Sequence, residues 1–499
     1  MVNNMKDKEV WLGVDLGTTN LKVVAFGVEG DKDNVITKAT ACCALTSSHP
    51  GEAVQSAAEV SDALFDCLKT VVGELSGVEI QGICFSGAMH SLLGISQDDQ
   101  PVHPILTWAD TRSTAQADVL RASGFANVLY QRTGTPVHSM SPLTKLLWIK
   151  ENQQHWANET HRWVSAKSWA LFLLTGDWVE DEGIASASGL LNLRSRDWDE
   201  LALEQAGVTR HQLARVVKGA TPMKLTEAAR LRIGLTEAVT VYPGGSDGAL
   251  ANVGMGVTAS TQVALSLGTS GALRTTFDEI TLDSEGRLFC YLLDEKHYVV
   301  GGAINNAGLA IAWLREQLFD KEITEDEMIS GTASIEPGAN GLFFLPYLSG
   351  ERAPVWQSGM RATLHGLTLS HSRLHITRAI LEGVAFQLSW ILRLLDNLRK
   401  VPSNFNEIQV SGGATRSEVW MQILSDSLNR TLVTRHHQEV SCRGAVRLVQ
   451  KVLHGRPYPK ADEAELEGSV VPSEAARKYE VLFEHYRALH RTLYPPKED

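Results

Sequence analysis

Apolar runs broken by short polar turns recur along the chain and predict strands and helices in alternation. Near the start, the apolar runs 10–15 and 21–26 flank the turn residues 17–19, a pattern typical of two strands joined by a tight turn. The pattern returns over 263–277, where Leu-Gly-Thr-Ser stands in place of Leu-Gly-Thr-Thr. Because the two copies lie about half the chain apart, they indicate two domains that each contain a related hairpin.

Helical patterns occur in both halves of the chain. The dipeptide Ser141-Pro142 is typical of a helix start, and a strongly apolar helix is predicted from 372 through 391. The strand 407–410 is followed by the turn Gly412-Gly413 and another helix. Strands that alternate with helices predict an α/β fold, and the glycine-containing stretch 254–262 is the expected boundary. The expected domains are residues 8–256 and 257–499.

Composition and charge describe an ordinary globular protein. A chain of 499 residues, 43% hydrophobic and 21% charged, is long enough for two or three domains. The formal net charge of −12, with no dense run of Lys or Arg, argues against a nucleic-acid partner. The six cysteines form no C-x-x-C pair, and no stretch resembles a signal peptide or a membrane span. We therefore expect a cytoplasmic protein with no membrane partner and no zinc site.

The two turns are candidates for phosphate binding. Glycine and small hydroxyl residues allow backbone N–H groups to converge on an anion. Neither turn is a P-loop or a Rossmann turn, because G-x-x-x-x-G-K-[ST] is absent and a strand, not a helix, follows each turn. One such turn is commonly a plain hairpin, whereas one in each domain is able to hold a polyphosphate from opposite sides. The candidate residues are Gly17, Thr18, Thr19, Gly268 and Thr269.

Asp15 stands at the end of an otherwise apolar strand, next to the first turn. A buried carboxylate without a partner is unfavourable, so this side chain needs one. It either accepts hydrogen bonds from the amides of the turn or binds Mg²⁺, directly or through water. We favour Mg²⁺ because this ion prefers one or two carboxylates together with substrate phosphates.

A second carboxylate follows the predicted strand 239–242, in the sequence Pro-Gly-Gly-Ser-Asp-Gly. Asp247 therefore stands at the carboxyl end of a strand, where open α/β sheets bind ligands. The same segment satisfies G-x-S-x-G, the nucleophile motif of α/β-hydrolases, with Ser246 as the nucleophile. A hydrolase remains an alternative, although it explains neither Leu-Gly-Thr turn. A plain Asp-Gly turn is the third interpretation.

Two further loops carry polar and aromatic residues directly after apolar strands: 86–90, with Met89 and His90, and 108–112, with Trp108. A lone histidine is commonly structural, and Asp110 with Arg112 is compatible with a surface ion pair. Neither loop identifies a function by itself.

Taken together and in this order, these segments resemble the FGGY family of carbohydrate kinases between about residues 11 and 453. Residues 140–152 resemble the first family signature and 366–383 the second, and the segments DLGTT, SLGTSG, PYLSGERAP and SGGA stand where family members have them. The resemblance implies two actin/hexokinase-like (ribonuclease H-like) ATPase domains with a cleft between them. The N-terminal domain would bind the sugar and the C-terminal domain the nucleotide.

The resemblance also implies roles for individual residues. Asp247 matches the general base that accepts the proton of the attacking sugar hydroxyl, and Asp15 matches a carboxylate associated with Mg²⁺. Residues that match the sugar site are Met89, His90, Trp108 and Asp247. Residues that match the ATP site are Gly17, Thr18, Thr19, Gly268, Thr269, Gly412, Gly413, Ala414 and Ser417. ATP is the implied co-substrate, and positioning with charge neutralisation suits phosphoryl transfer.

Within the family, SGAMHS, WADTR, RTGTPVHSMSPL and GGSDG resemble the members that convert D-gluconate to 6-phospho-D-gluconate. Members that act on xylulose share the Met-His pair but usually carry Gln-Met-His-Gly, and members that act on glycerol carry an Arg-Glu pair that is absent here. Xylulose or another pentulose or polyol therefore stays the alternative substrate.

A gluconate substrate requires a cationic or amide clamp for its carboxylate, and the choice among Arg112, Arg132 and Arg352 is open. The implied partners are the sugar acid and ATP, and a homodimer is compatible with the family. Two alternatives from other classes remain, the serine hydrolase and a nucleotide-gated binding protein without a small substrate.

Overall fold

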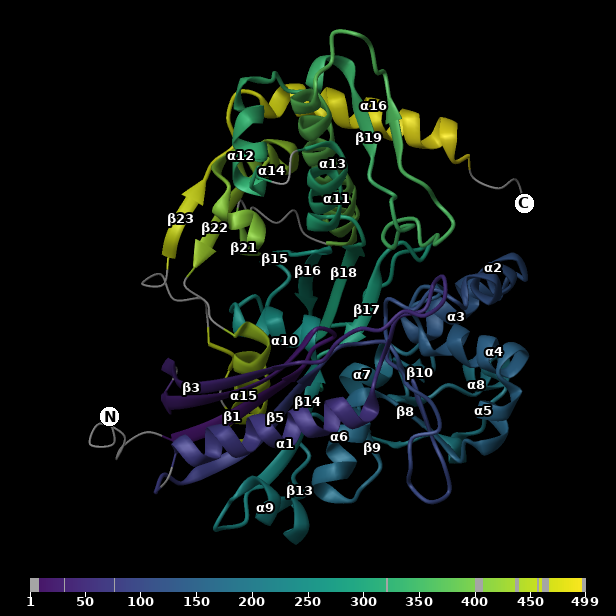
Figure 1. Cartoon of the computed structure of the whole chain (residues 1–499), viewed down its shortest axis with the longest axis vertical. Coiled ribbons are helices and arrows are strands. Elements are labelled where there is room, and N and C mark those ends of the chain that lie inside the picture. Colours follow the sequence, from purple (N-terminus) through teal and green to yellow (C-terminus); the bar gives the residue numbers. More distant parts are fainter. Residues whose placement is uncertain are drawn as a thin grey trace. The chain divides into compact units, whose positions relative to one another are not determined.

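The computed structural model describes residues 9–30, 32–75, 77–319, 322–399, 407–435, 439–455, 457–459 and 466–495 (Figure 1). These residues form two compact units. Unit 1 comprises Met1–Thr258, Phe277–Val299 and His437–Ala461, and unit 2 comprises Ala259–Thr276, Val300–His436 and Asp462–Asp499. Among the described residues, no helix is both long enough and apolar enough to cross a membrane.

Unit 1 is built on a six-stranded sheet with the order β13-β14-β5-β1-β2-β3. Its strands are β1 (Glu9–Leu16), β2 (Asn20–Glu29), β3 (Lys32–Cys42), β5 (Ile80–Gly87), β13 (Met223–Lys224) and β14 (Thr240–Ser246). β1, β2 and β3 form an antiparallel meander, whereas β1, β5 and β14 run parallel. The inner strands are buried on both faces, as expected for parallel strands covered by helices.

Helix α1 (Ala57–Glu74) packs against β2 and β3, and α15 (Val440–His454) packs against β1, β5 and the helix α10 (Asp247–Gly254). Helix α15 comes from the last part of the sequence, yet it lies beside α10 in unit 1 (Figure 1). Two glycines allow this approach, because a Cβ on Gly444 would lie 1.9 Å from the Leu250 carbonyl oxygen and one on Gly254 would lie 2.0 Å from that of Val440. Ion pairs from Lys22 to Glu439 and from Asp33 to Arg447 fasten the helix to the meander.

The remaining elements of unit 1 are short helices and two-stranded sheets. The strand pairs are β4 (Val54–Gln55) with β7 (Ile105–Leu106), β6 (Leu93–Ile95) with β8 (Arg162–Val164), β9 (Val179–Asp181) with β12 (Arg215–Val217), and β10 (Leu191–Asn192) with β11 (Asp197–Trp198). The helices are α2 (Thr114–Ala122), α3 (Phe125–Thr133), α4 (Pro142–Asn152), α5 (Gln154–Glu159), α6 (Ala166–Thr175), α7 (Glu182–Ser186), α8 (Glu200–Ala206) and α9 (Glu227–Ile233). The strand β17 (Phe289–Leu292) also falls within unit 1.

In unit 2 the strand order is β18-β16-β15-β21-β22-β23, within a seven-stranded sheet. The strands are β15 (Val263–Leu267), β16 (Gly271–Phe277), β18 (Tyr298–Ile304), β21 (Glu407–Gly412), β22 (Thr431–Arg435) and β23 (Leu466–Val470). β15 pairs antiparallel with β16 and parallel with β21, which in turn runs parallel to β22. This order repeats that of unit 1, with β15, β16, β21 and β22 in the places of β1, β2, β5 and β14.

The helices of unit 2 are α11 (Gly308–Leu318), α12 (Glu325–Ser330), α13 (Arg373–Leu398), α14 (Glu418–Leu428) and α16 (Ala476–Leu493), and β19 (Phe343–Leu345) pairs with β20 (Thr363–His365). Helix α13 is buried over most of its length. The helices predicted to start at Pro142 and near residue 372, and both predicted hairpins, are therefore present.

Candidate active site

Three parallel strands of unit 1 end at the same edge of the sheet and bring Asp15, Ser86 and Asp247 together. Ser86 on the central strand β5 is in register with Asp15 on β1, and the next residue, Gly87, is in register with Ser246 on β14. The Ser86 hydroxyl donates a hydrogen bond to Asp15 Oδ1 at 2.7 Å. Asp247 follows Ser246 directly, so both predicted carboxylates stand at this carboxyl edge, where such sheets bind ligands.

The carboxylate of Asp15 is buried and receives a hydrogen bond on only one of its two oxygens from the described residues. Burial raises the pKa of its carboxyl, and the hydrogen bond from Ser86 and the positive charges of Lys22 and Lys167 oppose the rise. Among the described residues only Ser86 donates to this carboxylate, through Oδ1. A carboxylate with an open oxygen fits a magnesium ion whose other ligands come from phosphates and water. The described part of the chain contains no group of three or more His, Cys, Asp or Glu that would hold a metal by themselves.

Asp247 is the first residue of helix α10, where a negative charge is favourable because the helix N-terminus carries a partial positive charge. Its Oδ1 accepts a hydrogen bond from the Gly248 amide at 2.7 Å, and its backbone carbonyl accepts one from the Ser441 hydroxyl of α15 at 3.4 Å. The neighbouring Ser246 hydroxyl is buried and has no hydrogen-bond partner among the described residues. Within the described ranges no base lies in hydrogen-bond contact with Ser246, so the geometry gives the hydrolase alternative no support.

Lys167 holds the strand that presents Asp247, and the sequence analysis missed it. Its side chain is 1% exposed, forms an ion pair with Asp181 Oδ2 at 2.5 Å and donates a hydrogen bond to the Gly245 carbonyl at 2.7 Å. This second bond fixes the backbone two residues before Asp247. The signal in the sequence was a lysine inside an otherwise apolar helix pattern, Ala-Lys-Ser-Trp-Ala-Leu.

A small cavity beside the first turn collects several of the predicted sugar and phosphate residues. Its lining includes Gly17, Thr18, Met89 and Trp108. The Trp108 indole N–H donates to the Thr18 hydroxyl at 2.9 Å, and the side-chain amide of Gln55 donates to the Thr18 carbonyl at 2.8 Å. The turn and the loop that carries Trp108 are thus joined directly, and Gln55 is a further lining residue that the sequence analysis did not identify.

His90 and Thr19 lie apart from this cavity lining. The His90 ring lines a neighbouring cavity, and its Nδ1 lies 2.7 Å from the Ala187 carbonyl oxygen, to which it donates when protonated there. Its backbone φ is 68°, a left-handed conformation that is unusual for a residue other than glycine. Thr19 is exposed on the turn, where its carbonyl accepts from the Cys43 amide at 2.9 Å.

Unit 2 contains a cavity of about 250 Å³ that gathers the other predicted phosphate and nucleotide residues. Its lining includes Gly268, Thr269, Gly413, Ala414 and Ser417, together with Gly308, Glu325 and Arg416. Residues 307–309, at the start of α11, hold the turn through backbone hydrogen bonds to the carbonyls of residues 268 and 269 at 2.9–3.2 Å. The glycines that line the cavity let a ligand approach the backbone closely, which suits a phosphate chain.

Gly412, the predicted nucleotide residue outside this lining, directly precedes Gly413 and pairs with Leu267 in the sheet. Its φ is 103°, and a Cβ there would lie 2.1 Å from the Leu267 carbonyl oxygen, so only glycine fits.

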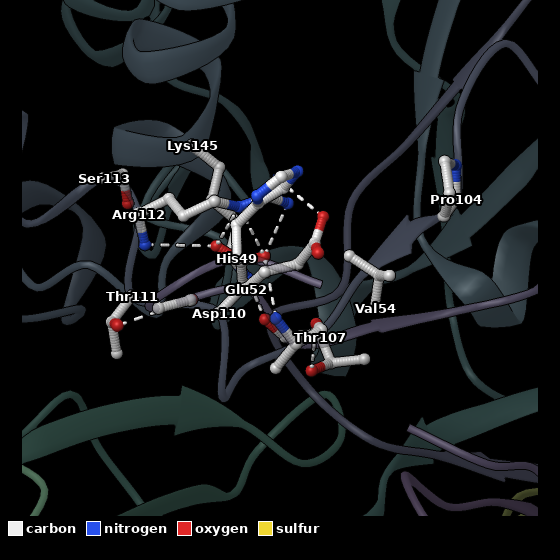
Figure 2. Close-up of polar contacts among 12 residues, drawn as sticks. His49, Glu52, Val54, Pro104, Thr107, Asp110, Thr111, Arg112, Ser113 and Lys145 are labelled. Atoms are coloured by element: carbon white, nitrogen blue, oxygen red, sulfur yellow. Dashed lines mark hydrogen bonds and ion pairs between the residues drawn. The ribbon is translucent and has the colours of Figure 1, made fainter. Parts of the chain in front are cut away.

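Each of the three candidate arginines for a carboxylate clamp already has a protein partner. Arg112 contacts Asp110 at 2.7 Å and Glu52 at 3.0 Å and lies over the Trp148 ring, as Figure 2 shows for the two carboxylates. This ion pair is buried, with Asp110 only 1% exposed, whereas the sequence suggested a surface pair. Arg132 pairs with Asp199 at 2.8 Å, and Arg352 donates to the Asn305 side chain at 2.7 Å. The structure therefore singles out no clamp.

Comparison with known proteins gives a consistent picture over the whole chain. Family models match residues 10–254 (FGGY family of carbohydrate kinases, N-terminal domain) and residues 263–449 (FGGY family of carbohydrate kinases, C-terminal domain). A gluconokinase of Bacillus subtilis (strain 168) is 35% identical over 444 residues, which cover 87% of this chain and 86% of that protein.

Two solved structures from Lactobacillus acidophilus, a gluconate kinase and a ligand-bound xylulose kinase, each align with a TM-score of 0.90 at 29% identity. The first alignment covers 97% of this chain and 98% of the kinase, and the second covers 98% and 99%. On the motifs, the two-unit α/β fold and these matches, the chain belongs to the FGGY family of carbohydrate kinases.

Proposed function

We propose that the protein transfers the γ-phosphate of ATP to the 6-hydroxyl of D-gluconate, with Asp247 as the general base. The observation that carries this proposal is that Asp15 and Asp247 stand at the same edge of one sheet. Met89 and Trp108 line a cavity beside the turn that follows Asp15, and Trp108 donates a hydrogen bond to Thr18 of that turn. A base, an anionic site for a cation and a polar pocket are the parts that phosphoryl transfer to an alcohol requires.

In the proposed reaction the 6-oxygen of gluconate attacks the γ-phosphorus, the bond from that phosphorus to the β,γ-bridging oxygen breaks, and ADP leaves. The proton of the hydroxyl passes to the Asp247 carboxylate, whose orientation is held by the Gly248 amide. Lys167 keeps the strand before Asp247 in place through the Gly245 carbonyl. Asp15 would hold Mg²⁺, directly or through water, and the ion would neutralise charge on the transferring phosphate.

We assign the nucleotide to the cavity of unit 2, with Gly268 and Thr269 toward the phosphates and residues 412–414 with Ser417 toward the adenosine. The division into a sugar-side domain (8–256) and a nucleotide-side domain (257–499) belongs to the same proposal. A cytoplasmic location and a homodimer also stay predictions.

Gluconate is preferred to xylulose because a gluconokinase is 35% identical over most of the chain, whereas a xylulose kinase of Staphylococcus epidermidis is 27% identical over 98% of it. Xylulose is kept as the second candidate because the L. acidophilus xylulose kinase matches the fold with the same TM-score as the gluconate kinase.

The test measures ADP release by the purified protein with ATP and Mg²⁺ in the presence of gluconate, xylulose, ribulose, glycerol or no acceptor. We expect gluconate to stimulate the rate most strongly, and Asp247→Asn to lower kcat by about 100- to 10,000-fold, the usual contribution of a general base. A preference for xylulose would keep the mechanism and replace the substrate. No stimulation by any acceptor would overturn the proposal.

A further inference from the structure

A lysine on helix α4 is buried in unit 1 and, among the described residues, donates hydrogen bonds to backbone carbonyls without pairing with a carboxylate. Lys145 is in the first half of α4 (Pro142–Asn152) and is 1% exposed. Among the described residues it forms no ion pair. Its Nζ instead donates hydrogen bonds to the carbonyls of His90 and Thr107, each at 2.6 Å.

These two carbonyls belong to the two loops that carry the predicted sugar residues. His90 follows Met89 and has a left-handed backbone conformation at φ 68°, which is unusual for a residue other than glycine. Thr107 precedes Trp108, whose indole donates to Thr18 at 2.9 Å. Lys145 therefore ties the loop of Met89 and His90 to the loop of Trp108 from behind, and Trp108 ties both to the first turn.

The charges around Lys145 support a fixed position. Asp110 attracts the ammonium and Arg112 repels it, while Arg112 itself is held by Asp110 and Glu52 (Figure 2). The group thus contains two carboxylates, one guanidinium and one amine. Burial lowers the pKa of Lys145 to about 7. The bridge survives loss of that proton, because a neutral amine still has two N–H groups for two carbonyls.

Lys145 bonds to backbone atoms 55 and 38 residues away, both in loops at the sugar end of the sheet. Loss of its side chain would leave two buried carbonyls unpaired and the loops free to separate.

We propose that Lys145 is a positioning residue for the sugar: it sets the distance between the loop of Met89 and His90 and the loop of Trp108, and so determines sugar affinity without contacting the substrate. This inference rests on the proposed sugar kinase function and on the location of the sugar at these loops. The main effect is expected on the acceptor, because both loops that Lys145 joins carry predicted sugar residues, whereas the predicted phosphate residue Thr18 is reached only through Trp108.

The test compares Lys145→Met with the control Lys150→Met, which makes the same change at an exposed position of the same helix. We expect Lys145→Met to raise KM for gluconate by about tenfold or more and to leave KM for ATP within about twofold of the wild-type value. Lys150→Met should change neither constant. A merely structural role would lower the active fraction, and so kcat, with both KM values unchanged, and that result would overturn the proposal.

If Lys145→Met does not fold, Lys145→Gln provides the second variant, because it keeps an NH₂ donor group on a shorter side chain and so replaces the two hydrogen bonds only in part. Its KM for the sugar should lie between the wild-type value and the roughly tenfold higher value expected for Lys145→Met. An unchanged sugar KM in a folded Lys145→Gln protein would also overturn the proposal. Failure of the proposed kinase function is distinguishable from failure of this inference, because the wild-type protein would then show no gluconate-dependent ADP release. If xylulose proves to be the acceptor, the same comparison is made with xylulose.

Discussion

The two hairpins of the molecule share a strand order and differ in the charge that each carries. In unit 1, Asp15 on β1 is in register with Ser86 on β5, which donates to it at 2.7 Å. In unit 2, Ser266 on β15 is in register with Ser411 on β21, and their hydroxyls lie 3.4 Å apart. The same place in the repeat therefore holds a carboxylate in one unit and a hydroxyl in the other.

The opposite strand differs in the same way. Asp15 faces Lys22 across the first hairpin, whereas Ser266 faces Ala272 across the second, whose turn is one residue shorter. A buried carboxylate suits cation binding beside a transferring phosphate, whereas the second turn places no carboxylate next to an anionic ligand. The difference teaches that the scaffold repeats one hairpin in both units, and that under the proposed function the chemistry depends on the charged residue present in only one of them.

The substitution with the largest expected effect replaces Asp15 of unit 1 with serine, the residue at the same place in unit 2. Asp15→Ser should lower kcat by about 100-fold or more, because a cation site at a transferring phosphate contributes several kcal/mol. The melting temperature should stay the same or rise, since burial raises the pKa of Asp15 and the charged form is unfavourable in the folded state. ADP release at increasing Mg²⁺ and thermal unfolding are the measurements.

Asp98→Ser is the matched control, because Asp98 is exposed and makes no side-chain hydrogen bond or ion pair among the described residues. It should leave both activity and melting temperature unchanged. Full activity of Asp15→Ser at every Mg²⁺ concentration would remove Asp15 from the proposed chemistry and with it the contrast between the hairpins.

The glycines that end the central strands provide a sharper comparison of the two units. Gly412 is in register with Leu267, and Gly87 occupies the same place opposite Leu16. An alanine Cβ at 412 would meet the Leu267 carbonyl oxygen at 2.1 Å with φ at 103°, whereas one at 87 would meet the Lys167 side chain at 3.0 Å. Backbone cannot move aside as a side chain can.

Gly412→Ala should therefore lower the free energy of unfolding by about 1–3 kcal/mol and raise KM for ATP. Gly87→Ala should cost less stability and leave KM for ATP unchanged. Urea unfolding and initial rates at varied ATP check both statements. Equal losses in the two variants would show that the two strand ends are under the same constraint.

Much of the scaffold was predictable from the sequence because its signals are local. The apolar runs around 17–19 and 268–270 predicted both hairpins, and Ser141-Pro142 predicted the start of α4. Asp15 and Asp247 were also identifiable, since a carboxylate at the end of an apolar strand needs a partner.

What could not be predicted depends on contacts between residues far apart in the sequence. Lys145 and Lys167 stand in apolar helix patterns, and the backbone carbonyls that accept their hydrogen bonds lie 38 to 78 residues away. Helix α15 joins unit 1 through contacts to α10 across some two hundred positions, so periodicity gives no sign of its place. The burial of the Asp110–Arg112 pair was missed for the same reason, because Glu52 and Trp148, which cover Arg112, come from other segments.

The smallest expected effect concerns a buried acid of unit 2, which contrasts with Asp15 in accepting hydrogen bonds from backbone amides through one of its oxygens. Glu351 Oε1 accepts from the amides of Asn305 at 2.7 Å and Arg352 at 2.8 Å, yet burial raises the pKa of Glu351 to about 7. Below the ordinary pKa of 4.5 both folded and unfolded states hold the proton. Between 4.5 and about 7 only the folded state holds it, so this contribution to stability is lost as the pH rises through that window.

Glu351→Gln cannot lose a proton and should therefore gain stability relative to the wild type between pH 5 and pH 8, by about 1–3 kcal/mol. Urea unfolding of both proteins at the two pH values isolates this residue, because the other buried acids titrate equally in each. Glu474→Gln, at an exposed position of unit 2, should show no difference between the two pH values. A relative stability of Glu351→Gln that is the same at pH 5 and pH 8 would mean that Glu351 is ionised throughout, and that its two amide bonds outweigh its burial as Ser86 and Lys22 do not for Asp15.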